Sequence, residues 1–184
     1  KHVSKIKSSV SNLTTILNDF LSLEILEAGK LICVLEDFEL VNFCEMVKED
    51  MHGLLKTGQE IVYTHIGNQK TVHLDKQMMG NALLNLLSNA SKYSHENQDI
   101  QFVSKIEDQK LSITVSDKGI GIPKNEQKHL FDRFFRANNA TNIQGTGLGL
   151  NITKKYVELM CGSIILTSEE GEGTKAELLI DLKQ

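Results

Sequence analysis

Three glycine-rich segments in the second half of the chain constrain its fold more than any other feature. They span residues 117–123, 145–150 and 171–174. Glycine allows positive φ angles and close approach of the main chain, so a ligand can lie against backbone N–H groups. The second segment leads into a predicted helix, whose N-terminal amides and dipole favour a phosphate. Each segment alone is more typical of a turn, but their succession predicts a set of loops around one ligand.

The common nucleotide-binding signatures do not account for these glycines. The pattern GxxxxGK[ST] is absent from the sequence. Residues 171–176 match GxGxxA, but a strand is predicted to follow them where a dinucleotide-binding motif requires a helix. The sequence therefore excludes both the P-loop and the Rossmann interpretation.

Composition sets the class of protein. The chain has 184 residues, of which 40% are hydrophobic, enough for one domain with a real core. A net charge of −4 without a basic stripe argues against nucleic-acid binding. There is no signal peptide and no apolar run of the roughly 20 residues that a membrane span needs. Three scattered cysteines are typical of reduced thiols. We expect a cytoplasmic chain without direct membrane contact of its own, which could be the cytoplasmic part of a membrane-anchored protein.

The chain opens with a narrow apolar seam at spacings of three and four, followed by a helix stop at Gly29. The seam residues are Val3, Ile6, Val10, Leu13, Leu17 and Phe20. A lone helix with one apolar stripe needs a partner. It could pack on its own domain, or it could be half of a helical bundle. The seam is narrower than the apolar face of a surface helix, which favours the bundle.

The remaining pattern predicts an α+β fold, with helices beside a largely antiparallel sheet in a two-layer sandwich. Asp75 is a predicted N-cap. Predicted helices cover 41–57, 76–93 and 148–160, with short helical pieces at 124–135. Predicted extended segments cover 31–40, 61–66, 71–74, 100–107, 110–116, 163–168 and 174–182.

The helix predicted at 76–93 carries a polar face. Asn85 and Asn89 are four residues apart and therefore share one side of it, and Lys92 follows three residues on. Two amide oxygens and a nearby lysine suit a magnesium ion that carries phosphates, because Mg²⁺ prefers few protein ligands plus substrate oxygens and water.

Taken together, these motifs resemble the catalytic and ATP-binding domain of sensor histidine kinases, in the superfamily shared with gyrase, a heat-shock chaperone and mismatch-repair ATPases. Five segments resemble the family's motifs and occur in the family's order. Residues 85–94 resemble the N box, 117–123 the G1 box, 131–136 the F box, 145–150 the G2 box and 171–174 the closing Gly-x-Gly-Thr. The resemblance covers residues 31–184 and implies a Bergerat-type ATP-binding fold. Residues 1–29 resemble the second helix of the dimerisation and phosphotransfer bundle.

The resemblance also implies roles for single residues. Asp117 would accept a hydrogen bond from the adenine amino group, with help from Thr174. Asn89, with Asn85 as second ligand, would hold Mg²⁺, and Lys92 would meet the phosphates. Tyr93 would lie near the sugar and base, and Arg136 would stabilise the γ-phosphate. The pocket wall would include Gly119, Gly121 and Ile122. Further ATP-binding positions would be Phe131, Gly145, Thr146, Gly147, Leu148, Gly149 and Leu150, and residues 137–149 would form a mobile lid.

Position 85 favours a kinase over an ATPase. The hydrolytic members of the superfamily resemble one another in having a glutamate four residues before the metal-binding asparagine, where it activates water. This chain has Asn85 at that position, and an amide cannot act as a general base. The phosphoacceptor histidine would lie on a helix before Lys1. His95 lacks the motif's context and is interpreted as a solvent histidine. We expect ATP binding with Mg²⁺ and no autophosphorylation of this chain. We also expect homodimerisation of the full-length protein through the opening helix, and a response-regulator receiver domain as partner. The alternatives are a hydrolytic ATPase and a non-catalytic nucleotide-binding module.

Overall fold

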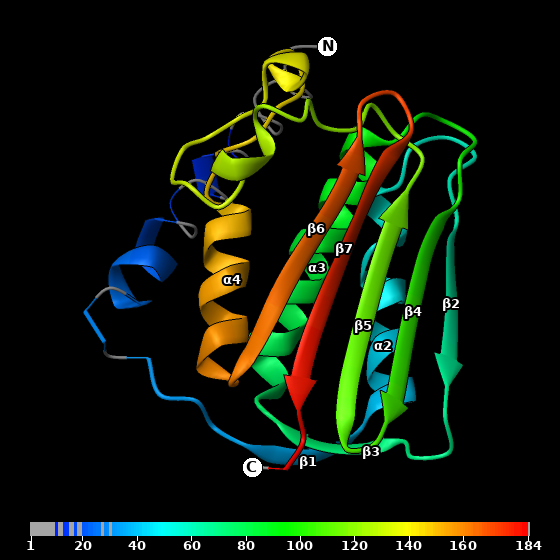
Figure 1. Cartoon of the computed structure of the whole chain (residues 1–184), viewed down its shortest axis with the longest axis vertical. Coiled ribbons are helices and arrows are strands. Elements are labelled where there is room, and N and C mark those ends of the chain that lie inside the picture. The colour runs from blue at the N-terminus through cyan, green and yellow to red at the C-terminus, as the bar shows by residue number, and fades with distance from the viewer. Residues whose placement is uncertain are drawn as a thin grey trace.

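A five-stranded sheet with three helices on one of its faces forms the body of the protein (Figure 1). The computed structural model describes residues 10, 13–14, 17, 20–26, 28–29 and 31–183. The helices are α2 (Leu40–Asp50), α3 (Lys76–Tyr93) and α4 (Gly149–Leu159). The strands are β1 (Glu36–Glu39), β2 (Ile61–Ile66), β3 (Thr71–Leu74), β4 (Ile100–Glu107), β5 (Lys110–Asp117), β6 (Gly162–Glu169) and β7 (Gly173–Asp181). The predicted α+β two-layer architecture is confirmed.

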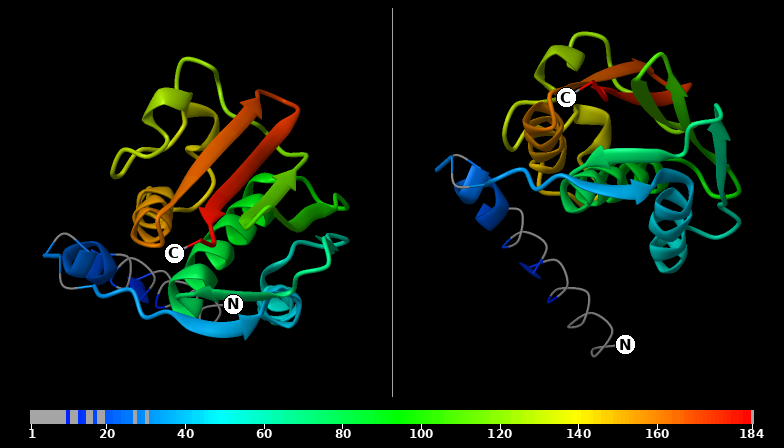
Figure 2. Two further views of the ribbon diagram at one scale, coloured as in Figure 1. Left: turned by 60° about the horizontal axis from the view of Figure 1, so that its bottom comes forward. Right: turned by 90° about the horizontal axis from the view of Figure 1, so that it is seen from below.

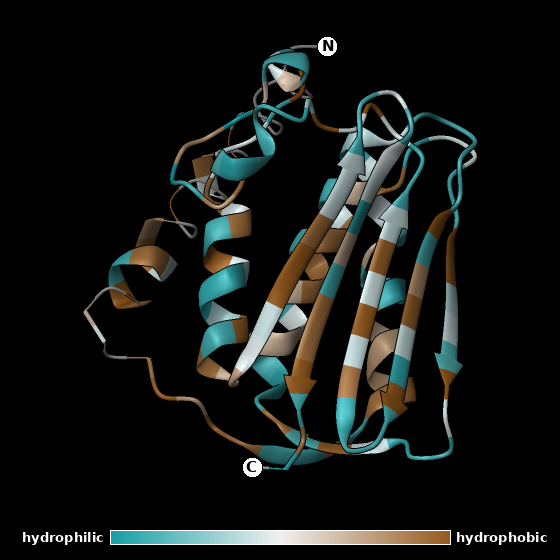
Figure 3. Ribbon diagram, in the orientation of Figure 1, coloured by the Kyte–Doolittle hydropathy of each residue, from teal (hydrophilic) through white to brown (hydrophobic). Residues whose placement is uncertain are grey.

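The sheet has the strand order β2-β4-β5-β7-β6. Its pairs are antiparallel except β2 with β4, which run parallel. Hydrophobic and hydrophilic residues alternate along β4 and β5, as expected for strands with one buried face (Figure 3). The strands β1 and β3 form a separate antiparallel pair. The predicted strands 61–66 and 71–74 have the right bounds, but they belong to different sheets.

The helix α3 is the central element of the helical layer. The Asp75 carboxylate accepts a hydrogen bond from the Met78 N–H at 2.8 Å, which confirms the predicted N-cap. Its apolar side is buried against the sheet, with Leu83 and Leu87 fully inaccessible to solvent. Its polar side therefore has to face away from the sheet, and this orientation creates the candidate site.

Two of the predicted helical segments differ from the structure. The helix predicted at 41–57 ends at Asp50, because Leu54 is 65% exposed and adds nothing to the buried stripe. The segment 124–135 holds only a three-residue 3₁₀ turn at Gln127–His129. The β4–β5 and β6–β7 hairpins and α4 agree with the prediction to within two residues.

Some apolar residues of the opening helix pack on the domain, and others face solvent. The described residues from Val10 to Leu26 are helical, and Gly29 ends the segment with a φ of +61°. Leu23 is buried and Leu26 packs against the core, beside α4 (Figure 2). The described seam residues point to solvent, with exposed fractions of 47–65%: Val10, Leu13, Leu17 and Phe20. Val3 and Ile6 lie outside the described residues. Among the described residues, no helix has the length and apolarity to cross a membrane.

An exposed apolar seam predicts self-association of this chain. We expect a mass that rises with concentration in size-exclusion chromatography with light scattering, and a monomer for the Leu13→Gln/Leu17→Gln variant. Leu54→Gln is the matched control, because Leu54 and Leu13 are both 65% exposed. A wild-type protein that stays monomeric at high concentration would contradict the prediction.

Candidate active site

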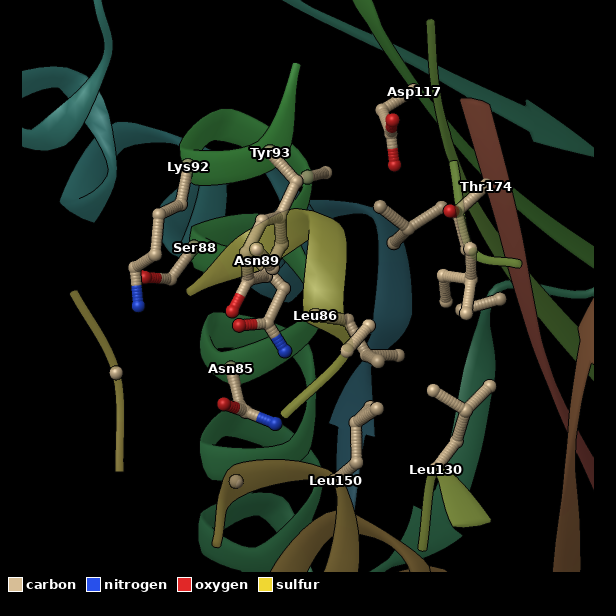
Figure 4. Close-up of a pocket in the computed structure, with 18 of the residues that line it drawn as sticks. Asn85, Leu86, Ser88, Asn89, Lys92, Tyr93, Asp117, Leu130, Leu150 and Thr174 are labelled. Atoms are coloured by element: carbon tan, nitrogen blue, oxygen red, sulfur yellow. The ribbon is translucent and has the colours of Figure 1, made fainter. Parts of the chain in front are cut away.

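The polar side of α3 forms one wall of a deep cavity. Figure 4 shows Asn85, Ser88, Asn89 and Lys92 on successive turns of this helix, with their polar ends toward the same open space. Asp117 and Thr174 approach from the strands on the other side. Leu83 and Leu87 are buried on one side of the helix. Because the helix repeats about every 3.6 residues, the Asn85 and Asn89 amides and the Lys92 ammonium group line up along the other side.

The cavity has a volume of about 900 Å³, within the range of small-molecule sites. Its floor between helix and sheet is apolar and consists of Leu86, Ala90, Val115 and Ala176. The polar wall and the apolar floor suit a ligand with a flat apolar ring at one end and charged groups at the other.

Asp117 lies at the end of β5, next to the apolar floor. Its carboxylate accepts hydrogen bonds from the backbone N–H groups of Gly119, at 2.9 Å, and Thr174. Burial raises the pKa of this carboxyl to about 6, and the two hydrogen bonds lower it only in part. The group remains a net acceptor above that pH, so it can receive an exocyclic amine from a bound ring.

Asn85 joins α3 to the start of α4. Its amide nitrogen donates to the Thr153 hydroxyl at 2.8 Å. A Cβ atom at Gly149 would overlap the Asn85 amide oxygen, so a larger residue at this position would have to displace that side chain. The hydrogen bond uses the nitrogen and leaves the oxygen as an acceptor.

Arg136 lines the cavity but is engaged with the following loop. Its guanidinium donates to the backbone oxygens of Ala140 at 2.8 Å, Thr141 at 3.2 Å and Ile143. These three carbonyls hold the positive charge at the rim of the cavity.

Side-chain hydrogen bonds hold the start of the predicted lid, residues 137–149, against the rest of the domain. The buried Glu126 carboxylate accepts hydrogen bonds from the backbone and side-chain N–H groups of Asn138. The Asn139 side chain donates to the Gly121 carbonyl at 2.9 Å. The loop is therefore anchored to the segment that follows Asp117.

The structure brings most of the predicted residues to this cavity. The lining includes Asn85, Asn89, Lys92, Tyr93, Asp117, Gly121, Ile122, Arg136, Gly145, Thr146, Gly147, Gly149, Leu150 and Thr174. Three predicted residues do not line the cavity: Gly119, Phe131 and Leu148. Leu148 belongs to the core, and the Phe131 ring instead packs against the Lys154 ammonium at 5.3 Å.

Sequence reasoning missed several lining residues. Four of them have the spacing of ordinary core residues, and only the fold shows that they line the floor of a cavity: Leu86 and Ala90 on α3, Val115 on β5 and Ala176 on β7. Ser88 stands beside Lys92 on the polar side of α3, and its i, i+4 spacing to Lys92 could have identified it (Figure 4).

Comparison with known proteins assigns this site to a family. Residues 74–184 match the family of histidine kinase-, DNA gyrase B- and HSP90-like ATPases. This chain belongs to that family. The match begins at the end of β3 and includes α3, the lid and the last hairpin. It therefore contains every predicted site residue, while Asp50, Met51 and Leu54 of the cavity lining lie before it.

Individual relatives of the chain are sensor kinases. The chain is 27% identical over 183 residues to the signal transduction histidine-protein kinase ArlS of Staphylococcus haemolyticus, covering 97% of this chain and 38% of that protein. It has the fold of full-length ShkA in complex with AMPPNP (TM-score 0.84, 23% identity, 97% of this chain and 38% of that one). It also has the fold of histidine kinase ThkA in complex with response regulator TrrA (TM-score 0.74, 23% identity, 100% and 51%). The chain thus spans well under half of the curated relative's length.

The raised pKa of Asp117 predicts a pH-dependent stability. An unfolded aspartate has a pKa of about 4, so this carboxyl takes up protons on folding between pH ~4 and ~6. Its contribution to stability falls as pH rises through that window. We expect Asp117→Asn to exceed the wild type by about 2 kcal/mol in free energy of unfolding at pH 7.5, and to match it below pH ~4. Urea unfolding across pH measures this, with the exposed Asp99→Asn as control. A difference that is constant with pH would contradict it.

The contact between Gly149 and Asn85 predicts an unusual response to alanine. Alanine normally stabilises a helix over glycine by about 0.5–1 kcal/mol. We expect this gain for Gly80→Ala in α3, where the new Cβ meets Phe43 at an ordinary 3.6 Å. Gly149→Ala should instead lose about 1–3 kcal/mol, because the new Cβ displaces the Asn85 amide.

The double variant Gly149→Ala/Asn85→Ala tests the cause of that loss. It removes the overlapping amide and should recover most of the stability in thermal unfolding. A loss that is unchanged in the double variant would show that the contact is not responsible.

Proposed function

We propose that this chain is the ATP-binding catalytic module of a sensor histidine kinase. In this proposal it transfers the γ-phosphoryl group of ATP to a histidine on a dimerisation helix outside the chain. The observation that carries the proposal is the division of one cavity into an apolar end beside Asp117 and a polar end beside Asn89 and Lys92. ShkA, which shares the fold, was solved with the ATP analogue AMPPNP.

Adenine is assigned to the Asp117 end. An ionised carboxylate accepts from the exocyclic amine of adenine and rejects guanine, which presents an oxygen at that position. Thr174 adds a hydroxyl beside it, which is within 2.9 Å of the Ser168 hydroxyl. Tyr93 closes the space between the two ends of the site, next to the sugar in this assignment (Figure 4).

The phosphates are assigned to the polar side of α3. The amide oxygens of Asn85 and Asn89 are one turn apart and form a donor set that fits Mg²⁺, which takes few protein ligands together with phosphate oxygens. A bound Mg²⁺ would neutralise phosphate charge. Lys92 would contact phosphate oxygens, and Arg136 would reach the γ-phosphate if its guanidinium leaves the carbonyls of the lid.

The direction of transfer follows from position 85. An amide cannot remove a proton from water, and its nitrogen is already bonded to Thr153. A histidine nitrogen brings its own lone pair, attacks the γ-phosphorus and displaces ADP as the Pγ–O bond breaks. The site needs only to position the two groups and to neutralise charge.

The partners follow from the same assignment. ThkA, a histidine kinase with this fold, was solved with the response regulator TrrA. We infer a receiver domain as the acceptor in the next transfer, and a homodimer through the exposed seam of the opening helix. We also infer a cytoplasmic location for the module, because its proposed substrate is ATP. Neither nucleic acid nor a membrane surface is part of the proposed activity.

Calorimetric titration with AMPPNP, with and without Mg²⁺, tests the proposal. We expect micromolar binding that weakens without Mg²⁺ and is lost in Asp117→Ala, because the carboxylate is the adenine acceptor. A second assay supplies the dimerisation helices of a related kinase together with Mg-ATP, and phosphohistidine should form on those helices only.

Other outcomes separate the alternatives. ADP release without an acceptor helix would indicate a hydrolytic ATPase. Binding without turnover or transfer would indicate a nucleotide-binding signalling module. Stable phosphohistidine on this chain alone would contradict the expectation that its acceptor lies elsewhere.

A further inference from the structure

The C-terminal end of α3 is capped by side chains from a segment far from it in sequence. The last carbonyls of a helix have no partner inside the helix. Here the carbonyls of Ser91, Lys92, Ser94 and His95 all accept hydrogen bonds from Lys56 or Gln59. Both donors lie between the 3₁₀ turn His52–Leu54 and β2, a region outside the glycine-rich motifs and outside the family match.

Lys56 supplies the charged part of this cap. Its ammonium group donates to the carbonyls of Lys92 and Ser94, each at 2.7 Å. A cation at the C-terminus of a helix interacts favourably with the helix dipole, and hydrogen bonds from a charged donor are stronger than neutral ones. The two carbonyls flank Tyr93, so Lys56 fixes the backbone on both sides of that residue.

Gln59 is held rigidly in the same cap. Its side-chain nitrogen donates to the carbonyls of Ser91 at 3.1 Å and His95 at 3.0 Å. Its side-chain oxygen accepts from the Ser91 hydroxyl at 2.7 Å and from the Lys56 N–H at 2.9 Å. The residue is only 6% exposed, and each of its polar atoms is used twice. Such a saturated amide has a single orientation.

The opposite side of the same backbone segment is joined to the strand end that carries Asp117. Ser94 forms an isolated antiparallel bridge with Gly119, and the Ile120 N–H donates to the Tyr93 carbonyl at 3.1 Å. The Gly119 N–H in turn donates to the Asp117 carboxylate. The segment 92–94 is thus held between Lys56 and Gln59 on one side and the Gly119 segment on the other.

We propose that Lys56 and Gln59 are positioning residues for the nucleotide site. They act through the backbone of residues 92–94, which carries Lys92 and Tyr93 into the cavity and aligns the Gly119 segment with Asp117. Neither side chain lines the cavity, so neither contacts the ligand. This inference rests on the proposed function, and it assigns the site a support that lies outside its motifs.

The variant Lys56→Met tests the inference, because it keeps the aliphatic stem and removes the ammonium group. We expect the dissociation constants of ATP and ADP to rise by about tenfold, the usual scale for a residue that orients a binding group. Both nucleotides should lose affinity alike, since the base and sugar side of the site is displaced. Lys56→Arg should restore most of the affinity. Lys70→Met, at an exposed lysine in the turn between β2 and β3, should bind as the wild type does.

If Lys56 had a purely structural role, its replacement would lower the free energy of unfolding and leave the affinity for nucleotide unchanged. Titrations are therefore run at a temperature where urea unfolding shows each variant to be folded. If Lys56→Met does not fold, Gln59→Glu replaces it, because this variant keeps the shape and loses both donors to the carbonyls of Ser91 and His95. It should also weaken ATP and ADP together.

The outcomes separate this inference from the function on which it rests. If the wild type binds ATP and a folded variant binds within twofold of it, the positioning role is wrong and the proposed function stands. If the variant weakens ATP but not ADP, the effect lies at the γ-phosphate and the role assigned to the base side is wrong. If the wild type binds neither nucleotide, both proposals are wrong.

Discussion

The burial of one side of α3 is the constraint on which the site depends. Leu83 and Leu87 are fully buried against the sheet, which fixes the rotation of the helix about its axis. The helical period then leaves Asn85, Asn89 and Lys92 on the opposite side. A rotation of the helix that withdrew these polar groups would expose the leucines, at a cost of about 1.5–3 kcal/mol for each. Packing in the core therefore sets the geometry of the polar wall.

The glycine-rich segments complete the site because they let backbone approach side chain. Gly149 lies against the Asn85 amide, and Gly119 pairs with Ser94 at the end of the same helix. Both contacts join α3 to elements that follow it by more than 20 residues. A single helix thus connects the Asp117 end of the cavity, the polar end beside Asn89 and Lys92, and the start of α4.

The sequence predicted much of this fold because its signals are local. The Asp75 cap, the period of α3 and the turn residues Asp108 and Gln109 are each written within a few residues. Most of the site residues that the motifs identified likewise line the cavity. Pairing of β2 with β4 and of β3 with β1 depends on contacts across the fold, which no local pattern contains. The early end of α2 and the orientation of Arg136 toward loop carbonyls were unpredictable for the same reason. The roles of the single site residues and the domain boundary at residue 30 remain predictions.

The attachment of the opening helix has a mechanical consequence. Leu23 and Leu26 pack on the core of the domain, while Leu13 and Leu17 of the same helix face solvent. The helix is therefore attached to the domain at one end, and its exposed apolar residues leave the rest of it available for another contact. Turning it far enough to detach Leu23 would expose a buried side chain, at a cost of about 1.5–3 kcal/mol. That amount corresponds to one to two orders of magnitude in the equilibrium between the packed and the detached position of this helix end.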